Sequence, residues 1–273
     1  MSEIEKALLD KYNELKEYIK SLEKVAVAYS SGVDSTFLLY AAKEAVGENA
    51  IAVTSCSASF PNREKVEAND FCKEYGIRQL VFESNELENE EYVKNPPNRC
   101  YICKKALFTG MLKLAEENGF CHMLEGSNLD DDGDYRPGMQ AIAELQVKRP
   151  LKKIGFTKQE IRLLSRYLGL PTWSKASFAC LASRFPYGEE ITSTKLRMVE
   201  QAEDYLMSFG FKQFRVRIHG ENLARIELLP EDFSRLWDEK IRSEIYGEFS
   251  KIGFAYTALD LKGYRTGSMN EIL

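Results

Sequence analysis

Residues 24–40 read K-V-A-V-A-Y-S-S-G-V-D-S-T-F-L-L-Y, and this stretch decides the fold. Val25, Val27 and Tyr29 alternate with alanines as in a short buried strand, and an apolar helical pattern begins after Ser35. N–H groups at a helix start have no partner inside the helix and lie at the positive end of its dipole. The turn can therefore bind an anion such as pyrophosphate. An ordinary strand-to-helix turn would show the same pattern.

Outward from this stretch, strands and helices alternate along the chain. An amphipathic helix is expected before it, over residues 2–22, and further buried strands are expected over residues 50–54, 77–82 and 121–125, with helices between them. This alternation predicts the α/β class with a doubly wound, mostly parallel sheet, whose ligands lie at the carboxyl ends of the strands.

The pattern changes past residue 190. Helix, strand, strand, helix and strand are expected in that order, over residues 192–209, 213–219, 223–228, 231–249 and 254–259. We therefore expect two domains, one over residues 1–188 and a small α+β domain over residues 189–273.

The composition gives no reason to expect nucleic acid or a membrane as partner. The 273 residues carry a formal net charge of −5, and the pI is about 5.4. Such a chain lacks a general attraction to nucleic acid or anionic lipid. It contains no stretch long and apolar enough to span a bilayer, and its first residues lack a signal-peptide pattern. We expect a cytoplasmic protein with reduced cysteines.

Three cysteines lie in segments that are candidates for chemistry. Residues 99–105 read R-C-Y-I-C-K-K and begin a predicted helix, so Cys100 and Cys103 lie on one side of its first turn. A redox pair, two metal ligands and incidental core cysteines all fit this spacing. Cys180 lies in residues 175–188, K-A-S-F-A-C-L-A-S-R-F-P-Y-G, which have neither helical nor strand periodicity.

These motifs resemble those of known families. Residues 30–35, S-S-G-V-D-S, resemble the PP-loop, S-G-G-x-D-S, of the ATP pyrophosphatases, which cleave ATP to AMP and pyrophosphate while adenylating a substrate. Nearly the whole chain resembles the LarE family of ATP-dependent sulfur transferases, which help to make the nickel-pincer nucleotide of lactate racemase. The matching motifs are the PP-loop, D-Y-R-P-G at 134–138, C-x-x-S-R-F-P-Y-G at 180–188, R-V-R-I-H at 215–219 and L-D-L-K-G-Y-R-T-G-S-M-N at 259–270.

The resemblance implies a site for ATP, with Mg²⁺ near Asp34, which would take part in catalysis. The implied nucleotide ligands are Ser30, Ser31, Gly32, Val33, Asp34, Ser35, Lys104, Gly126 and Arg136. One position departs from the family pattern: Ser31 replaces the first glycine of the PP-loop. Because serine has a Cβ, it tolerates positive φ poorly.

The resemblance also implies the sulfur chemistry. Cys180 matches the reactive cysteine of the family, and some members give up its sulfur. Members that also have Cys100 and Cys103 are thought to hold a [4Fe-4S] cluster with one open iron. Three thiolates suit such a cluster better than a closed zinc site, which needs four ligands. Zinc and a sacrificial Cys180 are the alternatives. Ser183 and Arg184 would stabilise the oxyanion.

The substrate is expected to meet arginines of the second domain. Arg215 and Arg217 are two apart on a predicted strand and share one face, which Arg225 joins from the neighbouring strand. Guanidinium groups suit phosphates and carboxylates, whereas a solvated sheet face is the simpler interpretation. The resemblance implies a carboxylated pyridinium mononucleotide bound by Arg184, Arg215 and Arg217. It further suggests a homo-oligomer, with a metal or a neighbouring subunit near Glu203, Glu227 and Asp232.

From these patterns we predict an ATP-dependent sulfur transferase that forms AMP and pyrophosphate. It would convert a carboxylate of the pyridinium nucleotide to a thiocarboxylate, taking sulfur from sulfide or another donor. A tRNA-thiolating PP-loop enzyme is one alternative, which the acidic pI and the lack of an RNA-binding tail disfavour. A non-catalytic regulatory protein that binds adenine nucleotide is the other.

Overall fold

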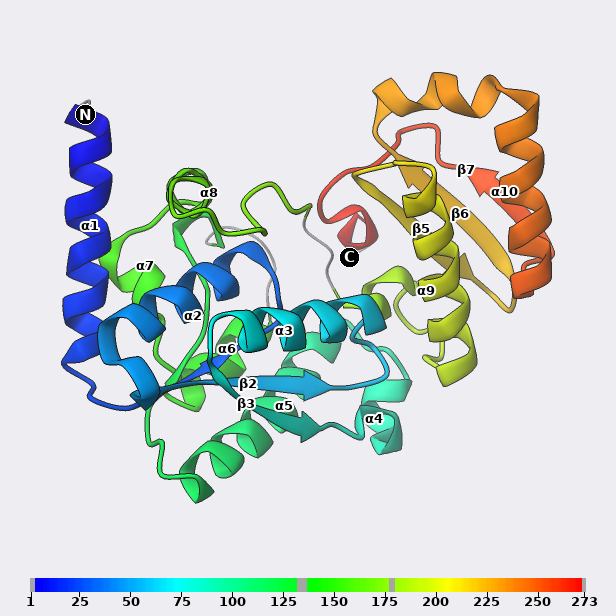
Figure 1. Ribbon diagram of the computed structural model, residues 1–273. Coiled ribbons are helices and arrows are strands. Elements are labelled where there is room, and N and C mark those ends of the chain that lie inside the picture. The colour runs from blue at the N-terminus through cyan, green and yellow to red at the C-terminus, as the bar shows by residue number, and fades with distance from the viewer. Residues whose placement is uncertain (1–2, 132–136, 177–179, 272–273) are drawn as a thin grey trace. The chain divides into compact units, whose positions relative to one another are not determined.

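The computed structural model describes residues 3–131, 137–176 and 180–271, and the chain forms two compact units (Figure 1). Unit 1 comprises Met1–Ser84 and Cys100–Ser177, and unit 2 comprises Asn85–Arg99 and Phe178–Leu273. The short helix α4 (Glu90–Val93) therefore belongs to unit 2, although it follows the third strand of unit 1 along the chain.

Unit 1 is built on a parallel sheet. Its described strands are β1 (Val25–Ala28), β2 (Ala50–Cys56), β3 (Arg78–Glu83) and β4 (Met123–Leu124). They adjoin in the order β3-β2-β1-β4, and every pair is parallel. Because β1 lies between β2 and β4, the chain winds outward in both directions from β1, and the carboxyl ends of β1 and β4 are adjacent. The predicted α/β class with a doubly wound parallel sheet is confirmed.

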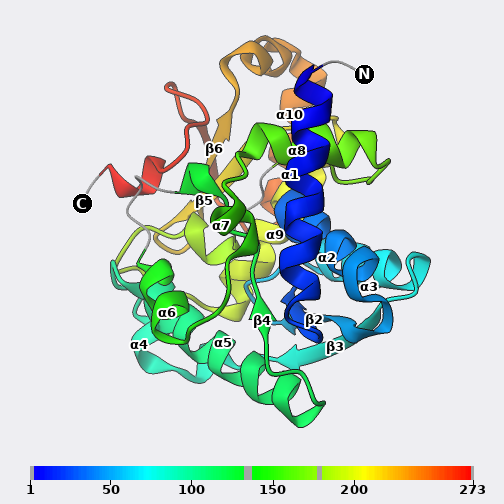
Figure 2. The ribbon, with the colours of Figure 1, turned by 90° about the vertical axis from the view of Figure 1, so that its left-hand side faces the viewer.

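Helices cover both faces of this sheet. The main ones are α1 (Glu3–Lys20), α2 (Val33–Val46), α3 (Asn62–Glu74), α5 (Arg99–Glu117), α6 (Gly138–Glu144), α7 (Pro150–Ile154) and α8 (Lys158–Tyr167). Val25 and Val27 of β1 face a core that contains Phe37 of α2, whereas Ala26 faces Phe108 of α5. Figure 2 shows α1 beside α2 and α7. Among the described residues, no helix has the length and apolar character needed to cross a membrane.

Unit 2 is a small α+β unit. Its sheet has the order β5-β6-β7, formed by β5 (Phe214–His219), β6 (Leu223–Leu228) and β7 (Tyr256–Leu259). Strands β5 and β6 are antiparallel, and β6 and β7 are parallel. Two helices, α9 (Ser193–Ser208) and α10 (Glu239–Ile252), pack against each other and on this sheet (Figure 1). The helix, strand, strand, helix, strand order predicted here is confirmed.

Two predicted elements differ from the structure. The helix expected over residues 231–249 is wrong in its first half, because Pro230–Trp237 is a 3₁₀ helix and α10 begins only at Glu239. Asp238 separates the two by accepting hydrogen bonds from the backbone N–H groups of Lys240 (2.8 Å) and Ile241 (3.2 Å). The strand expected over residues 121–125 is shorter, since only Met123–Leu124 pairs with β1.

Candidate functional site

The PP-loop forms the turn between β1 and α2, at the carboxyl end of β1. The Ser35 hydroxyl fixes the turn, since its Oγ accepts from the Ser30 backbone N–H (3.3 Å) and donates to the Gly32 carbonyl (3.2 Å). Gly32 precedes α2 and has no side chain with which to cap the helix. The first N–H groups of this 14-residue helix therefore face the turn as a site for an anion.

Ser31 adopts a left-handed backbone conformation, with φ +52°. For a residue with a Cβ this conformation costs about 1–2 kcal/mol. Two contacts offset that cost: the Ser31 hydroxyl donates to Glu64 Oε2 (2.6 Å), and Lys175 Nζ donates to the Ser31 carbonyl (3.1 Å). The loop thus does require positive φ at the position where the family pattern has glycine, and Ser31 is held there by these two hydrogen bonds.

Asp34 in the first turn of α2 pairs with a lysine from α8. Lys158 Nζ lies 2.5 Å from Asp34 Oδ2, and the Lys158 backbone N–H donates to Asp130 Oδ2 (2.8 Å). Burial raises the pKa of Asp34 above its usual range, and the Lys158 ammonium opposes the rise. Among the described residues, Asp34 Oδ1 is buried without a hydrogen-bond partner. This oxygen is therefore available to a ligand such as Mg²⁺.

The end of β4 approaches the PP-loop closely at Gly126. A Cβ at this residue would lie 3.1 Å from the Ser35 backbone nitrogen and 3.2 Å from the Asp34 carbonyl carbon. An added methyl group would therefore press against this backbone, and the structure brings Gly126 together with Asp34 and Ser35.

Lys104 of α5 lies near the same edge of the sheet. Burial raises the pKa of Glu125, while hydrogen bonds from Ser127 and the charge of Lys104 oppose the rise. The Lys104 side chain also runs along Gly138, since a Cβ there would lie 2.6 Å from Lys104 Cδ. Arg136, the remaining predicted nucleotide ligand, lies outside the described residues.

Two lysines at the PP-loop were not predicted from the sequence. Lys158 contacts Asp34 and Lys175 contacts Ser31, although these pairs are separated by 124 and 144 residues along the chain. Arg162 of α8 helps to hold Lys175, because its guanidinium donates to the Lys175 carbonyl (2.8 Å). The sequence marks only the position of Lys158, because it directly follows Thr157, the residue that caps the start of α8.

The predicted metal ligands are divided between the two units. Cys100 and Cys103 lie in the first turn of α5 in unit 1, and Cys180 lies in unit 2. All are thiols in the structure, and Cys100 and Cys180 are exposed. Within either unit, the described residues contain no group of three His, Cys, Asp or Glu side chains suited to a metal. The three-cysteine metal set stays a prediction.

Cys180 directly precedes a short 3₁₀ turn, Leu181–Arg184, which is anchored by a buried ion pair. Arg184 has no exposed surface, and its Nε and Nη2 each lie 2.8 Å from a carboxylate oxygen of Glu203, which is equally buried. Arg184 Nη1 donates to the Cys180 carbonyl (3.2 Å) and to the Ser183 hydroxyl (2.8 Å). Burial works to raise the pKa of Glu203, but Arg184 lowers it overall. The pair thus fixes the backbone that carries Cys180.

The sheet of unit 2 buries the other predicted substrate arginines. Arg217 donates to the Ser183 carbonyl (2.9 Å) and to Glu227 Oε2 (2.7 Å), and it lies opposite Arg225 in the β5–β6 register. Burial lowers the pKa of Arg215 to about 10, which leaves it protonated at neutral pH. The face is therefore not a solvated one, and substrate contact by these arginines stays a prediction.

The three carboxylates suggested for a metal or a neighbouring subunit have partners within unit 2. Glu203 and Glu227 are fully buried against Arg184 and Arg217, and Asp232 pairs with Arg235 (3.2 Å). The structure gives the two buried carboxylates a structural role, since they neutralise arginines that would otherwise repel one another.

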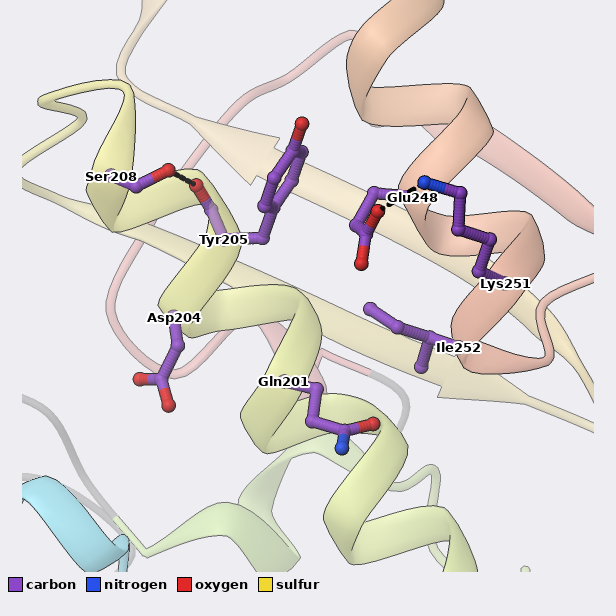
Figure 3. Close-up of a pocket in the computed structure, with 7 residues that line it drawn as sticks. All are labelled: Gln201, Asp204, Tyr205, Ser208, Glu248, Lys251 and Ile252. Carbon is purple, nitrogen blue, oxygen red and sulfur yellow. Dashed lines mark hydrogen bonds and ion pairs between the residues drawn. The ribbon is translucent and has the colours of Figure 1, made fainter.

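A surface hollow of about 500 Å³ lies between α9 and α10 (Figure 3). Its rim is polar: the Ser208 hydroxyl donates to the Tyr205 carbonyl (2.6 Å), and Lys251 pairs with Glu248 (2.9 Å). No predicted site residue lines it. The hollow is therefore separate from the candidate site.

Comparisons with known proteins place the chain among homologues of similar length. It is 41% identical to an uncharacterized protein of Synechocystis sp., covering 97% of this chain and 99% of that protein. It is 35% identical to the pyridinium-3,5-bisthiocarboxylic acid mononucleotide synthase of Lactiplantibacillus plantarum, covering 93% and 92%. A shorter match, 25% identical over 55% of this chain and 52% of the other, is to a subunit of the glutamine-hydrolyzing GMP synthase of Thermoplasma volcanium. No protein-family model matches.

Proposed function

The chain belongs to the LarE family of pyridinium-3,5-bisthiocarboxylic acid mononucleotide synthases, and from this premise we propose that it is an ATP-dependent sulfur transferase. It would adenylate a carboxylate of a pyridinium mononucleotide and convert it to a thiocarboxylate, releasing AMP and pyrophosphate. The PP-loop carries the proposal, because an uncapped helix start, the Gly126 approach and two lysines meet there.

The first step is attack of the substrate carboxylate on the α-phosphorus of ATP. The P–O bond to pyrophosphate breaks as the new P–O bond forms, so negative charge accumulates on the leaving group. The N–H groups at the start of α2 and the nearby lysine side chains would neutralise that charge, and Asp34 Oδ1 would hold Mg²⁺. Positioning and charge stabilisation supply most of the rate in this class of reaction.

The second step forms a carbon–sulfur bond and breaks the carbon–oxygen bond to AMP. Ser183 is suited to stabilise the developing oxyanion: its oxygen accepts from Arg184, so its own O–H can donate to substrate. Buried Arg184 would act through Ser183 and through the Cys180 backbone. Arg184 has no exposed surface, so we assign the contact with substrate to Ser183 and a positioning role to Arg184.

Cys100, Cys103 and Cys180 would hold a [4Fe-4S] cluster, a group whose ligands are thiolates. The residues fit in chemistry: three thiols are present, and two of them lie three residues apart on one helix turn. When bound, the cluster would supply sulfur at an open iron.

The anionic substrate would be bound by unit 2. Arg215 and Arg217 lie on one strand, and with Arg184 and Arg225 they place four guanidinium groups around Glu203, Glu227 and Asp260. Guanidinium groups gathered in this way suit a phosphate and two ring carboxylates. We also propose that the protein is a homo-oligomer.

The proposal is tested by anaerobic incubation of the purified protein with ATP, Mg²⁺, sulfide and pyridinium-3,5-dicarboxylic acid mononucleotide. We expect AMP and pyrophosphate in equal amounts and a product in which sulfur replaces a carboxylate oxygen. Failure to release pyrophosphate with this substrate would exclude the function. Iron and labile sulfide analysis tests the cluster separately: a colourless protein that loses one H₂S from Cys180 per turnover would make that cysteine a sacrificial donor.

A further inference from the structure

Lys175 is surrounded by more acceptors than it has protons. Its Nζ lies 2.5 Å from Glu64 Oε2, 3.1 Å from the Ser31 carbonyl and 3.3 Å from Ser31 Oγ, and it also contacts Glu67. An ammonium has three N–H donors, so four acceptors cannot all receive a full hydrogen bond. The lysine is thus held at the PP-loop, and at least one of these contacts is weak.

The two carboxylates around Lys175 differ in exposure. Glu64 is only 4% exposed. Its ionised carboxylate acts only as a hydrogen-bond acceptor, and it also accepts a hydrogen bond from the Ser31 hydroxyl (2.6 Å). The side chain of Glu67, one turn further along α3, is 50% exposed. An exposed ion pair is weak and exchanges readily with solvent, whereas a buried charge needs its partner. Glu67 is therefore the partner that Lys175 can leave.

The position of Lys175 determines what it would meet next. Its ammonium touches the Ser31 carbonyl, one residue before Gly32 and the uncapped start of α2. A polyphosphate bound at that helix start would lie beside the ammonium. A lysine ammonium binds phosphate as a point charge and needs no fixed orientation. A rotation of the flexible Lys175 side chain would therefore bring its ammonium into contact with a phosphate oxygen.

We propose that Lys175 binds the pyrophosphate part of ATP and that Glu67 restrains it while the nucleotide is absent. The inference rests on the proposed ATP binding and adds a ligand that no local motif marks. On binding, the ammonium keeps Ser31 and Glu64 and exchanges Glu67 for a phosphate oxygen. Ser31 thereby serves both the backbone shape of the loop and the placement of the lysine.

The test measures ATP, pyrophosphate and AMP affinity by titration calorimetry on four full-length proteins: wild type, Lys175→Met, Lys175→Arg and Glu67→Gln. Lys175→Met should weaken ATP and pyrophosphate binding about tenfold or more and leave AMP binding within about twofold. Lys175→Arg should recover part of the loss. Glu67→Gln should bind ATP about two- to fivefold more tightly, because the competing carboxylate is gone.

A matched control is Lys73→Met, which removes a positive charge from an exposed position of α3, the helix that carries Glu67, and should change no affinity. Equal ATP affinity in wild type and Lys175→Met would overturn the inference while leaving ATP binding intact. Equal losses for ATP and AMP would also overturn it, because they would indicate a collapsed loop. If wild type binds no ATP, the proposed function itself fails. Glu67→Gln keeps the test decisive should Lys175→Met misfold, since unchanged or weaker ATP binding there refutes the restraint.

Discussion

The substitution Glu203→Gln isolates the ion pair that anchors the Cys180 turn. The two side chains have no exposed surface and meet through two contacts of 2.8 Å. Glutamine keeps the shape and an oxygen for the Val216 backbone N–H, which now donates to Glu203 Oε1 (3.0 Å). Its amide nitrogen, however, would face a guanidinium donor, and Arg184 would stay buried without its counter-charge.

Breaking a buried ion pair by removing one partner costs about 3–5 kcal/mol. That loss corresponds to a fall of about two to nearly four orders of magnitude in an equilibrium constant. Native-state hydrogen exchange of the β5 amides reports this loss directly, and we expect their protection to fall by that factor. The expected loss concerns unit 2 alone, and exchange in β1 and β2 serves as an internal reference.

Two controls separate the effect of burial from that of charge alone. Glu248→Gln breaks an exposed pair with Lys251 in the same unit and should destabilise it far less, because solvent screens such a pair. The double variant Arg184→Met/Glu203→Leu removes both charges and should recover much of the stability lost by Glu203→Gln. A Glu203→Gln protein no more destabilised than Glu248→Gln would refute the anchoring role of the buried pair.

Three further outcomes are expected. Gly126→Ala should weaken ATP binding about tenfold or more, because its Cβ would lie 3.1 Å from the backbone of the PP-loop; Gly247→Ala, where a Cβ meets nothing within 4 Å, is the control in calorimetry. Burial raises the pKa of Cys72 to about 12, so this thiol should be the slowest of the six to react with iodoacetamide at pH 8, as followed by mass spectrometry of the apoprotein. Burial, and then the Arg225 charge, lower the pKa of His219 below 6.5. As pH falls, His219 is therefore protonated first in the unfolded chain, so its contribution to stability is present above pH 6.5 and is lost below it. Urea titrations across this range should show the free energy of unfolding falling with pH, and His219→Gln should make that fall smaller.

The spacing of apolar residues along the sequence was sufficient to predict individual strands and helices. The Val25–Tyr29 alternation and the apolar run after Ser35 predicted β1 and α2, and the structure places Gly126 against the first turn of α2. The broken helix near residue 231 was missed because Asp238 was not recognised as a cap. Asp238 directly precedes residues with apolar helical spacing, and this position would have indicated the start of a helix at Glu239.

Long-range pairing could not be predicted from the sequence. The ion pair between Arg184 and Glu203 places a predicted substrate ligand in the interior, and Lys175 reaches the PP-loop from 144 residues away. A charged side chain carries no sequence mark of the partner it will meet. Which charges are buried, and against which partners, is decided by tertiary packing.

The Ser31 turn also bears on how the protein is made. Its left-handed serine depends on Glu64, which follows early in the chain, and on Lys175, which leaves the ribosome 144 residues later. A nascent chain that has completed β1, α2 and α3 still lacks the lysine that steadies the turn. Nucleotide competence should therefore emerge late in synthesis, and a chain released before Lys175 would fold its first strands without gaining a working PP-loop.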